Sequence, residues 1–158
     1  MSYMIAFLFP RYANKPMVSL LLLALRLIFG VLFMIHGVDK MLNFATLSQS
    51  FPDVTGMGSS ISLMVTIFIE LFCSLAFIVG FMFRLVLLPM IASMFVAFFV
   101  IHRASVLQGE LALIYLVVFL LLAVVGPGSY SIDNPLGAYV IENRKCKEAL
   151  RSGSESDV

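Results

Sequence analysis

The chain has 158 residues, of which 61% are hydrophobic and only 12% are charged, and its mean hydropathy is +1.06. Since roughly half of the residues of a typical soluble domain are apolar, this composition excludes an ordinary soluble protein and indicates a membrane protein. Ten Lys and Arg stand against nine Asp and Glu. Without an excess of basic residues, the chain has no electrostatic field for binding nucleic acid.

Four apolar runs are predicted to cross a lipid bilayer as helices, because a helix rises by about 1.5 Å per residue. These runs cover residues 17–37, 61–83, 85–102 and 107–126. Arg84 alone separates the second run from the third, which predicts a very tight turn there. Pro89 is expected near the start of the third helix, where a proline costs little. Gly126-Pro127-Gly128 is expected to end the fourth.

The fold predicted from these runs is an all-α, integral membrane four-helix bundle over residues 1–141. The long segment 38–60 is expected to hold a short interfacial helix, because apolar side chains recur between Met41 and Leu47. The proline and glycines from Pro52 to Gly58 then return the chain to the membrane. That return is interpreted either as a lid over the mouth of the bundle or as a plain surface loop.

Basic residues are divided unequally between the two ends of the predicted bundle. On the side of both termini lie Arg11, Lys15, Arg84, Arg144, Lys145, Lys147 and Arg151. The opposite side has only Lys40 and Arg103. The positive-inside rule therefore predicts that both termini are cytoplasmic and that the two longer loops face out. Residues 142–158, rich in charge and serine, are predicted to be a disordered cytoplasmic tail.

Two charged residues, Arg26 and Glu70, lie deep within the first and second apolar runs. A charge at the bilayer centre costs about 2.5 to 3.5 kcal/mol on insertion scales, so each of them needs a partner. The two helices enter the membrane from opposite sides and both residues reach a similar depth, which predicts a buried Arg26–Glu70 ion pair. This pair is interpreted either as a functional centre or as a structural clasp.

Helical spacing predicts which face of each of these helices looks inward. On the first helix the face comprises Arg26, Gly30, Phe33, Gly37 and Lys40, and on the second it comprises Glu70, Cys73, Phe77, Phe81 and Arg84. Cys73 and Cys146 are too few and too far apart for a redox pair or a zinc cage. Cys73 is therefore either a contact for a ligand beside Glu70 or a small buried apolar residue.

A second polar group collects where the first and third helices end and the fourth begins. It includes His36, Lys40, His102 and Glu110, which are expected to form a polar pocket for an anionic or carbonyl-bearing ligand. Two histidines and a carboxylate can also bind zinc or iron, but no short metal-binding motif joins them, and no metal site is predicted. The aromatic run of Phe95, Phe98 and Phe99 is interpreted as contact for a quinone ring or as packing or lipid contact.

Several motifs follow one another along the chain in a characteristic order. They are Arg26-Leu27-Ile28-Phe29-Gly30, His36-Gly37-Val38-Asp39-Lys40, Glu70 in an apolar run ending at Gly80 and Arg84, then Glu110, and Gly126-Pro127-Gly128-Ser129-Tyr130-Ser131-Ile132-Asp133. Their order and spacing resemble the DoxX family of small bacterial membrane proteins. The resemblance implies four helices in the bacterial inner membrane and a relationship to a membrane subunit that passes electrons from thiosulfate to quinone. Ser129 departs from the basic residue that is usual in the last motif.

The functional expectation is a membrane protein that binds a quinone or a small sulfur-containing or anionic metabolite in an outward-facing pocket. Glu70, His36 and Glu110 are the candidate catalytic, proton-moving residues, and Arg26, Lys40, His102 and Cys73 are the candidate ligand contacts. No intrinsic cofactor is expected, so a partner protein would supply the redox centre and the chain alone is not expected to be an enzyme. The alternatives are a solute transporter working as a homodimer and a non-catalytic assembly factor.

Overall fold

The computed structural model describes residues 16–133, and the predicted tail lies outside this range. The described helices are α2 (Pro16–Leu42), α3 (Phe44–Leu47), α4 (Ser59–Phe68), η1 (Ile69–Cys73), α5 (Ser74–Val79), α6 (Phe83–Val96), η2 (Ala97–Ile101) and α7 (Val106–Val125). The π-helical segments η1 and η2 continue α4 and α6 without a break. Four helical stretches are thus long and apolar enough to cross a membrane, which confirms the predicted all-α, four-span architecture.

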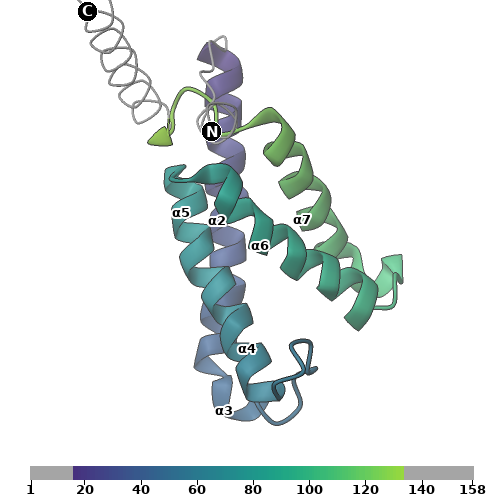
Figure 1. Ribbon diagram of the computed structural model, residues 1–158. Helices are drawn as coiled ribbons and strands as arrows, with labels where there is room; N and C mark the ends of the chain where they lie inside the picture. The colour runs from purple at the N-terminus through teal and green to yellow at the C-terminus, as the bar shows by residue number, and fades with distance from the viewer. Residues whose placement is uncertain (1–15, 134–158) are drawn as a thin grey trace, which may run out of the picture.

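The helices form two pairs that separate toward one end of the bundle (Figure 1). α2 packs along α4, η1 and α5, while α6 packs along α7. α6 contacts η1 and α5 near the α5–α6 turn and slants away from α4 beyond them. We call the end with α3 and the start of α7 the loop end, and the end with the α5–α6 turn the turn end.

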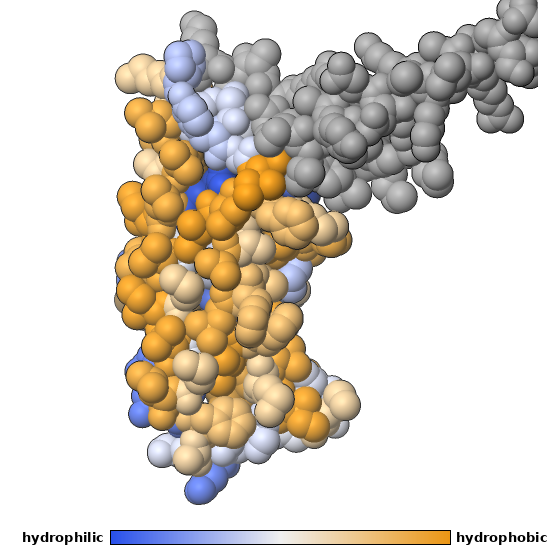
Figure 2. All heavy atoms as spheres, turned by 90° about the vertical axis from the view of Figure 1, so that its left-hand side faces the viewer, coloured by the Kyte–Doolittle hydropathy of each residue, from blue (hydrophilic) through white to orange (hydrophobic). Residues whose placement is uncertain are grey.

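The outer surface of the bundle is apolar, as a membrane-spanning protein requires. Figure 2 shows hydrophobic side chains over most of one face, with hydrophilic side chains mainly toward its two ends. Inside, α2 approaches the second span closely through small residues. A Cβ atom added at Gly37 would lie 2.9 Å from the Glu70 Cβ. Arg26, Gly30, Phe33 and Gly37 are all buried, so the inward face predicted for the first helix is correct.

The short interfacial helix predicted in the first long loop is present as α3, although it has only four residues. The tight turn between the second and third spans lies at residues 80–82 rather than at Arg84, which belongs to the first turn of α6. Gly80 ends α5 in the left-handed conformation, with φ of 75°, a role that glycine fills at low cost. Pro89 therefore lies inside α6, beyond the first turn where it was expected.

An aspartate far along the chain fixes the start of α6. The Asp133 carboxylate accepts hydrogen bonds from the backbone N–H groups of Met82 and Phe83, both at 2.8 Å. The first N–H groups of a helix have no intrahelical acceptor, and the positive end of the helix dipole lies there, so they favour a negative charge. The segment after α7 is thereby tied to the α5–α6 turn.

Arg26 ties the same segment to the end of α5. Its guanidinium is fully buried and donates to the carbonyls of Phe77 at 3.1 Å, Ile78 at 2.6 Å, Pro127 at 3.0 Å and Tyr130 at 2.9 Å. Because α5 stops at Val79, the carbonyls near its end lack intrahelical partners and carry the negative end of the helix dipole. The planar fork of donors satisfies several of them at once.

The predicted ion pair between Arg26 and Glu70 is therefore wrong. Arg26 lies at the turn end among backbone carbonyls, whereas Glu70 binds Lys40 nearer the loop end. The two residues lie at similar positions within their apolar runs, which predicted the same depth in the membrane. That comparison did not include the unpaired backbone carbonyls at the end of α5, which bind a cation. Of the two roles considered, a functional centre and a structural clasp, Arg26 fits the structural clasp. Its partners are backbone carbonyls and not Glu70.

Replacing Arg26 by Leu should destabilise the bundle strongly, since four buried carbonyls lose their donor. We expect a loss of the order of 3 kcal/mol in unfolding free energy, because hydrogen bonds to charged groups contribute about 1.5 to 3 kcal/mol each and are not additive. Thermal unfolding in detergent measures it. Arg103→Leu is the matched control, since Arg103 is exposed at the loop end, and equal effects of the two substitutions would contradict the assignment.

Candidate ligand-binding cavity

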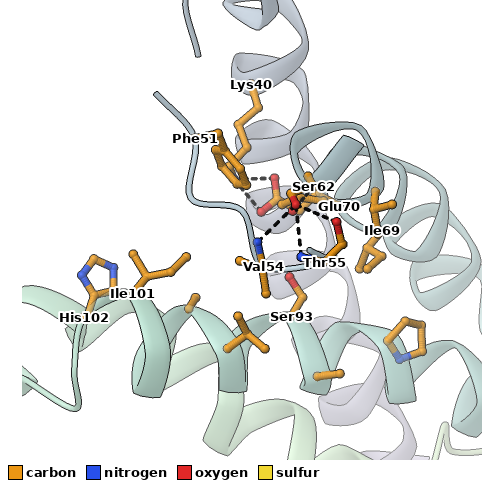
Figure 3. Close-up of a pocket in the computed structure, with 16 residues that line it drawn as sticks. Lys40, Phe51, Val54, Thr55, Ser62, Ile69, Glu70, Ser93, Ile101 and His102 are labelled. Atoms are coloured by element: carbon orange, nitrogen blue, oxygen red, sulfur yellow. Dashed lines mark hydrogen bonds and ion pairs between the residues drawn. The ribbon is translucent and has the colours of Figure 1, made fainter. Parts of the chain in front are cut away.

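A cavity of about 440 Å³ lies between the two helix pairs at the loop end. It is bounded by α4 and η1 on one side and by α6 and η2 on the other, and the segment 51–55 also contributes to its wall (Figure 3). The side chains that line it are Lys40, Phe51, Val54, Thr55, Ser62, Val65, Thr66, Ile69, Glu70, Pro89, Ala92, Ser93, Val96, Ala97, Ile101 and His102. Nine of these sixteen side chains are apolar, and the polar ones include a single carboxylate, that of Glu70.

The two π-helical segments found within residues 16–133 both border this cavity. η1 contributes Ile69 and Glu70, and η2 contributes Ala97 and Ile101. A π turn holds one residue more than an α turn and often occurs at a functional site. The extra residue also shifts the buried face, so that Ser74 rather than Cys73 is fully buried after Glu70.

The charged centre of the cavity is an ion pair between Lys40 and Glu70. The Lys40 Nζ lies 2.5 Å from one carboxylate oxygen of Glu70 and 2.6 Å from the other. The Glu70 side chain is only 3% exposed, whereas that of Lys40 is 25% exposed. One ammonium group therefore neutralises a carboxylate that would be costly to bury alone.

A single hydroxyl group holds the adjoining loop against α4. The Ser62 Oγ accepts from the N–H groups of Val54 and Thr55, each at 3.2 Å, and donates to the Asp53 carboxylate at 2.9 Å. Asp53 also accepts from the N–H groups of Gly56 at 2.9 Å and Gly58 at 3.0 Å. These bonds place Val54 and Thr55 in the cavity wall.

A smaller pocket of about 230 Å³ adjoins the cavity. It is lined by Phe33, His36, Lys40, Met94, His102, Gln108, Leu111, Ala112 and Tyr115. Lys40 and His102 line both spaces. The ion pair therefore lies where an apolar cavity and a polar pocket meet.

The structure brings some of the predicted site residues together and separates others. Lys40, Glu70 and His102 line the cavity, and His36 lines the adjoining pocket. Glu110 is exposed and lines neither space.

Cys73 packs against the apolar core, and its side chain also lines neither space. Within residues 16–133, no three His, Cys, Asp or Glu side chains gather as a metal site would require. The rings of Phe95 and Phe99 lie 4.5 Å apart, are about half exposed and line neither space, so they fit packing and lipid contact.

Sequence reasoning missed the hydroxyl groups of the site. Ser62, Thr66 and Glu70 are spaced four residues apart, which places them on one helical face. The same spacing joins Pro89, Ser93 and Ala97 on the opposing helix, where Ser93 points into the cavity (Figure 3). Two such stripes of small or polar residues in apolar spans could have predicted a cavity between the second and third spans.

The DoxX family model matches residues 21–103, which is more than half of the chain. The protein therefore belongs to the DoxX family. The match includes Lys40, Glu70 and His102 and ends before Glu110 and the motif from Gly126 to Asp133. No curated protein and no solved structure matches the chain.

The two partners of the ion pair should respond differently to substitution. Lys40→Met leaves a buried carboxylate unpaired and should cost about 3 kcal/mol of stability. Glu70→Gln should cost less, since the long side chain of Lys40 near the end of α2 can extend to the membrane surface. The double variant should recover most of the loss. Thermal unfolding of all four proteins gives the cycle, and additive losses would show that the residues do not interact.

The fold of the segment 51–58 should depend on pH through Asp53. Hydrogen bonds from the Ser62 hydroxyl, and then from the amides of Gly58 and Gly56, hold the pKa of Asp53 below its ordinary value. A lowered pKa means that the stabilisation is complete above the ordinary carboxyl pKa of about 3.9 and is lost as the pH falls through the lowered value.

Hydrogen exchange of this segment, corrected for the intrinsic pH dependence, measures the effect. Protection should persist at neutral pH and fall in acid, whereas Asp53→Ala should already reduce it at neutral pH. Equal protection in both proteins across the whole range would contradict the role of Asp53.

Proposed function

We propose that this DoxX protein binds a neutral, lipid-soluble molecule with a carbonyl-bearing ring, of the quinone class, in the cavity at the loop end. The observation that carries the proposal is the internally neutralised Lys40–Glu70 pair at the edge of a cavity whose other polar groups are hydroxyls and the imidazole of His102. A free anion such as a small sulfur oxyanion would need an uncompensated positive charge. The charge of Lys40 is already balanced by Glu70, which favours a neutral ligand.

The arrangement of polar groups also supports a quinone-like ring. The ammonium group of Lys40 and the hydroxyl of Ser93 offer donors to a carbonyl, and the carboxylate of Glu70 offers an acceptor to a hydroxyl of the reduced ring. The aliphatic side chains of Val65, Val96 and others supply the apolar contact that the ring needs. The cavity lies between α4 and α6, which diverge toward the loop end (Figure 1), and we expect the ligand to enter from the bilayer between these helices.

The proposed role is that of an accessory component of a membrane redox system. Reduction of a quinone takes two electrons and two protons, and the electrons would come from a partner protein that carries a redox group. We place the protein in the bacterial inner membrane, with both termini cytoplasmic and the cavity in the outer half, as the distribution of basic residues favours. Reporter fusions at the two termini and in the 51–58 segment test this orientation.

Binding of a short-chain ubiquinone or menaquinone analogue to the full chain in lipid nanodiscs tests the function. Glu70→Gln and the double variant Lys40→Met/Glu70→Gln should weaken binding about tenfold or more, as expected when hydrogen bonds to a charged group are lost. The double variant is informative because it should keep the fold.

Glu110→Gln is the matched control, since it makes the same chemical change at an exposed carboxylate outside both spaces. Its affinity should equal that of the unmodified protein. Unchanged affinity in the Glu70 variants would overturn the proposal, and so would an equal loss in the control.

A further inference from the structure

The adjoining polar pocket has no assigned role in ligand binding. Tyr115 is 3% exposed and lines this pocket with His36 and His102. Among the described residues, neither the Tyr115 hydroxyl nor the ring nitrogens of these histidines form a hydrogen bond. Buried polar groups are nearly always satisfied by protein or by water. The Tyr115 hydroxyl and the half-buried imidazoles of His36 and His102 can therefore bond to water in this space, whose volume of about 230 Å³ suits a chain of water molecules.

The pocket also leads from the surface to the ion pair. Gln108, exposed in the first turn of α7, lies at one part of its wall, and Lys40 lies at another. Lys40, which binds Glu70, lines the pocket together with His36 and Tyr115. In the cavity, by contrast, half of the lining side chains are aliphatic.

We propose that the pocket formed by His36, His102, Gln108 and Tyr115 is a water-filled inlet through which protons reach the Lys40–Glu70 pair from the aqueous phase at the loop end. Two routes then lead to the ion pair. A lipid-soluble ligand reaches it through the cavity, and protons reach it through the inlet. Among residues 16–133, the titratable groups that line the pocket with Lys40 are His36 on α2, His102 after η2 and Tyr115 on α7. His36 acts on the proton and not on the ligand, which makes it a positioning and relay residue.

The inlet is a proposal about access, and its first test needs no ligand. In a chain with Cys73 and Cys146 replaced by Ser, a single cysteine is introduced as Ala112→Cys in the inlet or as Ala123→Cys. Both positions lie on α7 and contact the apolar core, but Ala112 also lines the inlet, whereas Ala123 lines neither space. A charged, water-soluble methanethiosulfonate should modify Ala112→Cys in nanodiscs and leave Ala123→Cys unmodified. An unreactive Ala112→Cys in a protein with an unchanged melting temperature would overturn the inlet.

The second test follows the protonation of Glu70 itself. Infrared spectroscopy after a pH step should show a carboxyl band that is absent from Glu70→Gln. Modification of Ala112→Cys should slow the response of this band by blocking the inlet, and His36→Gln should slow it as well. A bulky substitution in the cavity, Ala97→Phe, should leave the rate unchanged. A response that the blocked inlet does not slow, or that is missing from the unmodified protein, would overturn the proposal.

The proposed function explains why protons would be needed at the ion pair, but the existence of the inlet does not depend on it. The inlet proposal and the quinone proposal can therefore be contradicted separately. Loss of the quinone proposal would appear as unchanged ligand affinity in the Glu70 variants, with the infrared response intact. Loss of the inlet would appear as an unreactive Ala112→Cys or an unslowed response, with ligand binding still sensitive to Glu70.

Discussion

A carboxylate within a membrane-spanning bundle must be neutralised inside that bundle, and the ion pair between Lys40 and Glu70 meets this requirement. The pair joins α2 to η1 at the point where the cavity and the polar pocket meet. Its net charge is zero, which makes the site compatible with a neutral ligand from the lipid phase. The position of Glu70 in a π-helical segment directs its carboxylate toward Lys40 and the opening between the helix pairs.

The other buried charge serves the fold. Arg26 joins the end of α5 to the segment after α7 through backbone carbonyls, and Asp133 joins that segment to the start of α6. Together they fix the turn end, where the two helix pairs are held together. At the loop end the two helix pairs diverge, because the direction of α6 is set at its first turn. The separation of the pairs and the cavity between them thus depend on a clasp at the opposite end.

Composition and apolar length were sufficient to predict the four spans, and the spacing of Arg26, Gly30 and Gly37 was sufficient to predict the inward face of α2. The partner of Arg26 could not be predicted, because the carbonyls it binds are backbone groups with no signature in the side-chain pattern. Which residues of the second span after Glu70 are buried could not be predicted either. A π turn adds a residue without any local sequence rule, and it exchanges Cys73 for Ser74 on the buried face.

The Lys40–Glu70 pair can be tested directly by a lipid-soluble carbodiimide, which activates a protonated carboxyl group. An amine within contact distance attacks the activated carboxyl and forms an amide, with release of a urea. Peptide mass spectrometry should therefore find Lys40 joined to Glu70, with the mass of one water lost from the pair. A Glu70 that carries a stable acylurea adduct while Lys40 stays unmodified would show that no amine lies beside it, and would contradict this account of the site.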